Sequence, residues 1–362
     1  MNLINKPLFY IFFLFAILFP RGTLYNAVSD YIHMLAISSS NSISIGYDSN
    51  PLRLSNNEIN ELIDKPYLLG NASSVHSRFV QYNIGIKFLS SKGLLPKLFN
   101  NRKTIFNLKF SDKTHFENKS KSAYNISFKI DQQLGAYRHL YIDYFLMPSY
   151  YLREYEDLDF VIDTDDVYYE AYQSCRFDIE KISFAYQSPL QDRKSKIKFG
   201  LSYEEQLFDK YFTEFDLNIL GLFGQVNFGD DKNRLMLYYS YENADNFRYL
   251  DDTFSTANIN RSYIQSRIKF SLMELLNSNE SCGFIIDSYY RDNRSTIFSD
   301  ELHYHRSHND ITFSLWYKTG KHKITFSNRR RTTVSPREWV NELKTFKRYN
   351  LTYTIALDKI KL

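Results

Sequence analysis

Apolar and polar residues alternate one by one along much of this chain. From Val80 to Phe88 every second residue is large and apolar, and the residues between them are Gln, Asn, Gly and Lys. The same alternation returns at 124–130, 197–203 and 349–357. Neighbouring side chains of a β-strand point to opposite faces, so this pattern predicts strands with one apolar and one polar face.

The alternation divides the chain into fourteen candidate strands. Most are longer than the ~9 to 11 residues that a tilted transmembrane strand needs. A change of phase between Ile179 and Ile182 predicts a bulge within one long strand. Short helices are predicted only in connections, at 56–63 and 335–346. The predicted strands are 42–50, 78–89, 104–112, 122–131, 138–151, 166–187, 195–207, 212–228, 233–244, 260–272, 282–291, 303–317, 321–331 and 346–358.

The connections between these strands alternate in length. Those after even-numbered strands are mostly turn-sized, such as 229–232, whereas those after odd-numbered strands are mostly long, such as 245–259. An even strand count with this asymmetry is typical of an outer-membrane barrel that has both termini in the periplasm. A soluble β-sandwich would explain the alternation but not the asymmetry. We therefore predict an all-β fold, a closed antiparallel transmembrane β-barrel of about 14 strands with short periplasmic turns and long external loops.

The N-terminus predicts export from the cytoplasm. An apolar block from Pro7 to Pro20 follows a short positively charged start and is too short for a comfortable transmembrane helix of ~20 residues. We predict a signal peptide at 1–27 with cleavage after Ala27, a short periplasmic segment at 28–41 and the barrel at 42–362. An uncleaved membrane anchor is the alternative. The compartment is then the outer membrane of a Gram-negative bacterium, where the barrel-assembly machinery and lipopolysaccharide are the expected partners.

Composition supports a membrane barrel and argues against nucleic-acid binding. Tyr and Phe number 30 each, yet the mean hydropathy is −0.42, as expected for strands with one apolar and one wet face. The net charge is +4 and is scattered without a basic stripe, which does not favour a nucleic-acid partner. Cys175 and Cys282 leave open either one long-range disulfide or two unpaired thiols on strands.

The first predicted strand carries a resemblance to known barrels. Its residues Gly46, Tyr47, Asp48, Ser49 and Asn50 resemble a run in porin-like bacterial barrels, including those at the C-terminus of surface lipoprotein assembly modifiers. In those proteins the run enters a long first external loop. The modifiers also carry a helical-repeat domain before the barrel, for which this chain has no room.

Lysines recur on the polar face between two apolar residues, as in Ile86-Lys87-Phe88. In the predicted topology most of them lie near the periplasmic rim and face the lumen. A ring of cations would attract anions. Alternatively, the lysines pair with interior acids such as Asp143, Glu204 and Asp287. The lysines of this predicted cationic ring are Lys87, Lys109, Lys129, Lys198, Lys269 and Lys323.

The predicted external loops carry a second set of charges. Arg329, Arg330 and Arg331, near the top of one strand, are candidates to bind lipopolysaccharide phosphates or an acidic sugar, or to neutralise an acidic loop. That loop is either a site for divalent cations or simply solvated. Its acids are Glu154, Glu156, Asp157, Asp159, Asp163, Asp165 and Asp166.

One histidine-rich stretch raises the question of an enzyme. Ser307, His308 and Asn309 are the residue types of outer-membrane phospholipases, but three consecutive strand residues cannot share one face. His303, His305 and His308 lack an obvious fourth metal ligand. We therefore predict no catalytic residues, no metal and no cofactor.

The function predicted from the sequence is an outer-membrane channel, porin-like, that passes a polar solute, with anions favoured if the lysines are unpaired. A barrel that exports or displays a protein or polysaccharide is the alternative. A hydrolase in the outer membrane is a third candidate.

Overall fold

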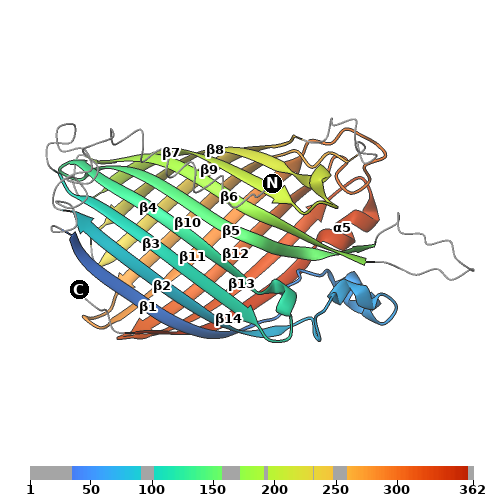
Figure 1. The fold of residues 1–362 in the computed structure, drawn as a ribbon, viewed down its shortest axis with the longest axis horizontal. Coiled ribbons are helices and arrows are strands. Elements are labelled where there is room, and N and C mark those ends of the chain that lie inside the picture. The colour runs from blue at the N-terminus through green and yellow to red at the C-terminus, as the bar shows by residue number, and fades with distance from the viewer. Residues whose placement is uncertain are drawn as a thin grey trace, which may run out of the picture.

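The chain folds into one closed antiparallel barrel of fourteen strands (Figure 1). The computed structural model describes residues 35–90, 102–156, 172–190, 195–230, 232–247 and 259–357. Each strand pairs with its neighbours in sequence, and β1 closes the barrel by pairing with β14. The predicted fold class and strand count are confirmed. The strands are β1 (Leu35–Asp48), β2 (Ser77–Ser90), β3 (Thr104–His115), β4 (Ala123–Gly135), β5 (Arg138–Glu156), β6 (Tyr172–Pro189), β7 (Lys196–Phe208), β8 (Leu217–Gly229), β9 (Asn233–Asn246), β10 (Tyr263–Leu275), β11 (Glu280–Asn293), β12 (Ser307–Thr319), β13 (His322–Val334) and β14 (Phe346–Ala356).

Short helices occur only in the connections between described strands. Both predicted helical stretches are confirmed, and they lie at the same end of the barrel (Figure 1). No helix in the described part of the chain is both long and apolar enough to cross a membrane. The helices are α3 (Asn56–Asn60), η1 (Glu61–Ile63), η2 (Pro66–Leu69), η3 (Lys119–Lys121), η4 (Thr213–Phe215) and α5 (Glu338–Lys344).

The N-terminal strand starts earlier than predicted. β1 begins at Leu35, so residues 35–41 belong to the barrel rather than to a separate segment. The prediction missed this start because 35–41 is rich in serine, and small polar residues weaken the alternation. The predicted signal peptide at 1–27 lies outside the described residues.

The predicted bulge lies on a different strand. β6 is a single strand whose pairing with β7 is unbroken. The extra residues are on β5, where Met147 pairs with Ile179 and Tyr150 pairs with Phe177. Ser149 between them has a φ of 51°. The phase change in β6 has another cause, since its lumen face becomes apolar where Phe177 stacks on Phe208 of β7, at 4.6 Å between ring centroids.

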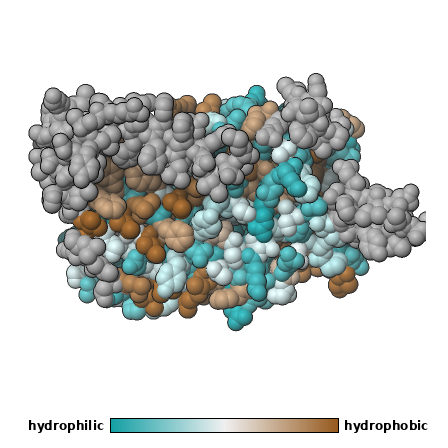
Figure 2. Space-filling model, viewed as in Figure 1, coloured by the Kyte–Doolittle hydropathy of each residue, from teal (hydrophilic) through white to brown (hydrophobic). Residues whose placement is uncertain are grey.

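The outer wall is apolar and the core is small. Large apolar side chains point outward and stay exposed, such as Leu220 and Ile268 at 60% each. Figure 2 shows them concentrated away from the end that carries α3 and α5. The buried clusters lie under loops at that end, as where Leu52 and Leu54 pack on Tyr151. A closed barrel with such an exterior is an integral protein of the bacterial outer membrane, and the end with the long connections is external.

Candidate functional site

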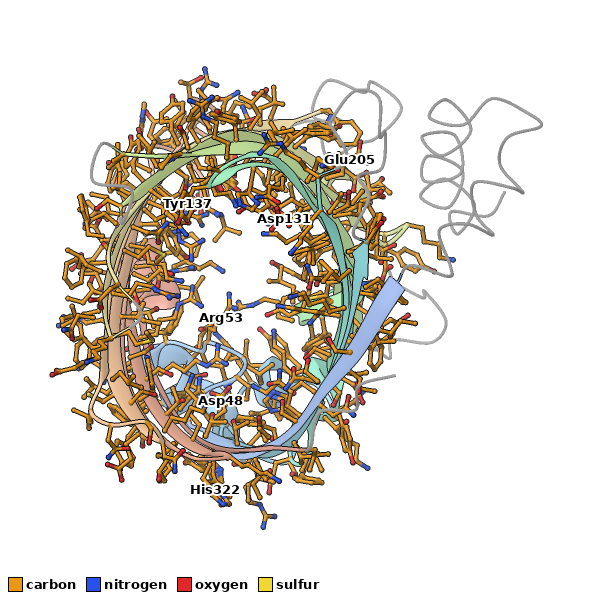
Figure 3. All side chains as sticks on the ribbon, turned by 90° about the vertical axis from the view of Figure 1, so that its left-hand side faces the viewer. Asp48, Arg53, Asp131, Tyr137, Glu205 and His322 are labelled. Atoms are coloured by element: carbon orange, nitrogen blue, oxygen red, sulfur yellow. The ribbon has the colours of Figure 1, made fainter. Side chains whose placement is uncertain are left out.

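Polar side chains line the lumen, and among the described residues the lumen-facing cations outnumber the carboxylates. Strand register assigns each residue to the lumen or to the outer wall. Seen along the barrel, the described side chains leave the centre open (Figure 3). Away from the bulged end of β5, the lumen-facing carboxylates are Asp48, Asp131, Asp143, Glu204, Glu242, Asp287 and Asp310, and the lumen-facing cations are Lys87, Lys109, Lys113, Lys129, Lys181, Lys196, Lys198, Arg234, Arg267, Lys269, Arg291, Lys318, Lys323, Arg329, Arg331 and Arg348.

Four arginines on β10, β11 and β13 form one side of this lumen, and we call Arg267, Arg291, Arg329 and Arg331 the arginine wall. The Arg267 guanidinium donates to both carboxylate oxygens of Asp287. Among the described residues Arg291 donates only to the neutral amide oxygen of Gln265, at 2.8 and 3.0 Å. A cavity of about 300 Å³ opens along this wall.

One carboxylate binds two arginines in the external part of the arginine wall. Asp310 accepts a hydrogen bond from Arg329 Nε at 2.7 Å and another from Arg331 Nε at 3.1 Å. Both guanidiniums also donate to the Tyr289 hydroxyl, at 3.1 and 2.6 Å, and that hydroxyl donates to Asp310 at 3.0 Å. The group therefore holds the positive charges of Arg329 and Arg331 against the one negative charge of Asp310. One positive charge is left uncompensated.

The first external loop, residues 49–76 and here called L1, brings a further arginine into the lumen. Asn50 closes a tight turn, because its side chain accepts from Leu54 N at 2.9 Å and donates to Leu54 O at 2.8 Å. Within the turn Arg53 has a φ of 60°, and the side chains of Leu52 and Leu54 are buried against the wall. This turn directs the Arg53 side chain toward the barrel axis (Figure 3).

Arg53 has no carboxylate partner among the described residues. Its Nη2 donates to the Tyr150 hydroxyl at 3.2 Å, and its buried Nε has no partner in that part of the structure. Tyr150 raises the pKa of Arg53, but burial and the positive charges of Arg329, Arg348 and Arg331 lower the pKa on balance. Arg53 is therefore a lumen cation that is bound to a tyrosine rather than to a carboxylate, and it lies within the positive field of Arg329, Arg331 and Arg348.

L1 is fastened on two sides. Ser55 caps α3 by accepting from Glu58 N at 3.1 Å, and the Glu58 side chain accepts from Ser55 N at 2.8 Å. The same Glu58 carboxylate pairs with Arg153 of β5 at 2.9 Å. On the other side Asn57 donates to Glu342 of α5 at 2.6 Å. These contacts fix the position of Arg53 at this end of the barrel.

The run Gly46–Asn50 has a structural role at the root of L1. A Cβ on Gly46 would come within 2.5 Å of the Phe79 ring and 2.6 Å of the Leu351 carbonyl, so only glycine fits there. Asp48 is fully buried and binds the Arg348 guanidinium through both carboxylate oxygens. The resemblance noted above therefore coincides with residues that start L1.

The six predicted lysines all face the lumen, but their surroundings differ. Lys129 lies 3.5 Å from the Asp143 carboxylate, and Lys129 and Lys198 lie 4.3 and 4.5 Å from the centre of one ring, that of Tyr141. Lys269 pairs across the sheet with Asp287, whose carboxylate is already bound by Arg267. Lys323 lies 4.8 Å from the Trp316 ring. Among the described residues Lys87, Lys109 and Lys269 have no ion pair.

The arginine triplet is divided between the two faces. Arg329 and Arg331 enter the lumen, whereas Arg330 is exposed on the outer wall, because neighbouring strand residues alternate. The three side chains therefore do not form one site.

The histidine stretch does not assemble a catalytic group in the described part of the chain. His303 is bound to Asp300 in the loop 294–306, at 2.9 Å, while His308 faces the lumen beside Tyr289 and His305 lies in the loop with a φ of 44°. Ser307 and Asn309 point away from His308 along β12. Cys175 and Cys282 are free thiols.

Most of the predicted acidic loop lies outside the described residues, including Asp157, Asp159, Asp163, Asp165 and Asp166. The described Glu154 is buried, and its carboxylate accepts from Ser174 at 2.6 Å and from Tyr151 at 3.1 Å. Glu154 is therefore a structural group under L1.

Sequence reasoning missed three arginines of the site. Arg267 lies two residues before Lys269 on the same strand, so the period that marked the lysine also marked this arginine. Arg291 could have been found in the same way. No sequence signal places Arg53 in the lumen, because its position depends on the L1 turn.

Comparison with known proteins gives structural likeness only. No family model matches this chain, and no curated protein matches it. The outer membrane channel DcaP of Acinetobacter baumannii has 8% identity over 90% of this chain and 98% of its own, with a TM-score of 0.47. OmpTdeltaL8, a loop-deletion mutant of an outer membrane protein of Vibrio cholerae, has 5% identity over 90% and 100%, with a TM-score of 0.43. The anion-selective porin from Comamonas acidovorans has 6% identity over 89% and 99%, with a TM-score of 0.39. Likeness at this level assigns neither a family nor a substrate to this chain.

Proposed function

We propose that this barrel is a channel that passes polar solutes and prefers anions. The observation that carries the proposal is Arg53, a cation without a carboxylate partner among the described residues, which points into the lumen within the field of Arg329 and Arg331. An anion that enters the lumen here is attracted both by Arg53 and by the arginines of the wall.

The electrostatic reasoning extends along the lumen. Low-dielectric walls focus the field of lumen-lining charges, so an excess of cations raises the local concentration of anions. Among the described residues Arg291 is bound only to the neutral amide of Gln265, and Lys269 lies four residues beyond Gln265 toward the periplasm on the same strand. Lys87 and Lys109 add positive charge on β2 and β3. The lysines of the predicted ring thus extend the path that Arg53 and the arginine wall begin.

Solute flux into liposomes tests this function. We expect proteoliposomes to swell faster in an isotonic anionic solute, such as gluconate, than in a cationic solute of similar size with matched counterions. If liposomes that admit neutral sugars swell equally fast in the anionic and the cationic solute, the protein is a channel without anion preference. No swelling with any solute would exclude a passive channel.

The second candidate is a barrel that exports or displays a protein or polysaccharide. It rests on the resemblance of Gly46–Asn50 to the barrels of lipoprotein assembly modifiers. The contacts of Gly46 and Asp48 account for the same residues as supports of L1, so we place the channel first. In either case we propose that a signal peptide at 1–27 directs secretion and that the barrel-assembly machinery inserts the chain.

A further inference from the structure

Two cations face each other on the outer wall above the apolar band. Arg330 on β13 pairs directly across the sheet with Lys347 on β14, and both side chains are exposed. They belong to the external third of the strand pair, close to the loop that contains α5. Like charges directly opposite on a sheet repel each other, so this arrangement calls for an anion between them.

The residues around this pair are suited to lipid. Ile311, level with Arg330, is 49% exposed, and toward the membrane the outward positions are apolar except Asn328, with Leu351 on β14 at 52% exposure. Phe326 and Tyr349 are exposed on the same surface. A ligand that contacts both the two cations and these apolar side chains needs a negatively charged head and hydrocarbon chains.

Two other outward cations near the external rim, Arg78 and Arg294, have carboxylate partners. Arg78 binds Glu117 at 2.6 Å, and Arg294 lies 3.9 Å from Asp245. By contrast, neither Arg330 nor Lys347 has an ion pair within the described residues. On the opposite wall Glu180 and Glu205 face each other in the equivalent outward positions, so the basic pair is confined to one side of the barrel.

We propose that Arg330 and Lys347 bind a phosphate group of an outer-leaflet glycolipid, whose acyl chains lie along Ile311, Phe326 and Leu351. The guanidinium supplies a planar pair of donors and the ammonium a point charge, and a phosphate monoester has enough acceptor oxygens for both. This site lies outside the lumen and does not depend on the channel function.

The test is the thermal stability of the purified barrel in detergent with added lipid A. We expect lipid A with its phosphates to raise the melting temperature in a concentration-dependent manner, and dephosphorylated lipid A to raise it much less. In the double variant Arg330→Gln/Lys347→Gln we expect about a tenfold weaker apparent affinity, because the charge-assisted hydrogen bonds are lost. The control Arg78→Gln/Arg294→Gln removes the same charge and should keep the wild-type response.

Three results decide the matter. Without lipid, the double variant should melt no lower than the wild type, because a like-charge pair has been removed; if it does not fold, each single substitution serves in its place. An unchanged lipid A response in these variants would overturn the site. A wild-type response that ignores the lipid phosphates, or that inorganic phosphate reproduces alone, would overturn the assignment to a lipid.

Discussion

Arg153 Nη1 of β5 lies 2.9 Å from Glu58 Oε1 of L1, and this ion pair joins the first external loop to the barrel wall. Glu58 is only 2% exposed and Arg153 only 16%. Glu58 also closes the N-terminus of α3 by accepting from Ser55 N. The buried Glu58 carboxylate therefore stabilises the helix within L1 and also attaches L1 to the barrel wall.

Replacing Glu58→Gln should release L1. Removing one member of a buried pair leaves the other charge uncompensated and typically costs about 3 to 5 kcal/mol, here in the free energy of opening L1. Hydrogen exchange of the backbone amides in 50–69 measures this opening. The control is Glu61→Gln, because Glu61 forms an exposed pair with Lys65 at 2.9 Å. Equal exchange in the two variants would show that the Glu58 pair does not hold the loop.

Replacing Arg53→Gln should weaken anion preference without opening the loop. Gln keeps a polar side chain at the position but removes the unpaired charge, and we expect the anion-to-cation permeability ratio to fall by about twofold or more at low salt. Screening should reduce this difference at high ionic strength. The control Arg78→Gln removes an outward charge that is paired with Glu117. If the permeability ratio changes as much in Arg78→Gln as in Arg53→Gln, the change does not come from a charge in the lumen.

The lumen lysines should differ in their effect on conduction. Lys129 is partly neutralised by Asp143 at 3.5 Å, whereas the Asp287 carboxylate opposite Lys269 is bound to Arg267. Reversal potentials under a KCl gradient should therefore shift toward cation permeation more in Lys269→Gln than in Lys129→Gln, with about a twofold change in the permeability ratio for Lys269. The reverse order would mean that pairing does not decide which lysine acts.

The loop 294–306 should loosen as the pH falls. Burial lowers the pKa of His303 to about 4, although the hydrogen bond with Asp300 opposes the shift and Arg306 adds to it. The unfolded imidazole, with its ordinary pKa near 6.5, binds a proton at a higher pH than the folded one. The stabilisation is therefore complete above about pH 6.5 and is lost toward pH 4, by about 1.4 kcal/mol per pH unit at most.

Hydrogen exchange of the Tyr304 and Arg306 amides, which donate within this loop, measures that loss after correction for intrinsic rates. His303→Asn cannot titrate, so its protection should change little between pH 7 and 5. A wild-type loop with the same protection at both values would contradict the expected shift.

The barrel could be predicted from the sequence because a membrane wall imposes a period of two on every strand. That period placed Lys87 and Lys269 on the lumen face and gave all fourteen strands in order. It failed at β1, where serines blur the alternation, and at β6, where Phe177 faces inward to pack under a loop.

The site was less accessible to sequence reasoning. Arg53 is a loop residue whose direction depends on the Asn50 turn and on the distant Glu58–Arg153 pair, and no local pattern encodes either contact. The pairing of Asp287 with Arg267 rather than Lys269 is a choice between side chains on one face, which periodicity cannot resolve. Arg330 was grouped with Arg329 and Arg331 by position in the chain, although alternation separates it from them.

The most direct test of an anion-preferring channel is the reversal potential of the wild-type barrel in a planar bilayer under a KCl gradient at low salt. We expect the sign that corresponds to chloride being more permeant than potassium, and we expect its magnitude to decrease as ionic strength rises and screens the lumen charges. A reversal potential of zero, or one of the sign that corresponds to potassium preference, would contradict the role assigned to Arg53 and the arginine wall.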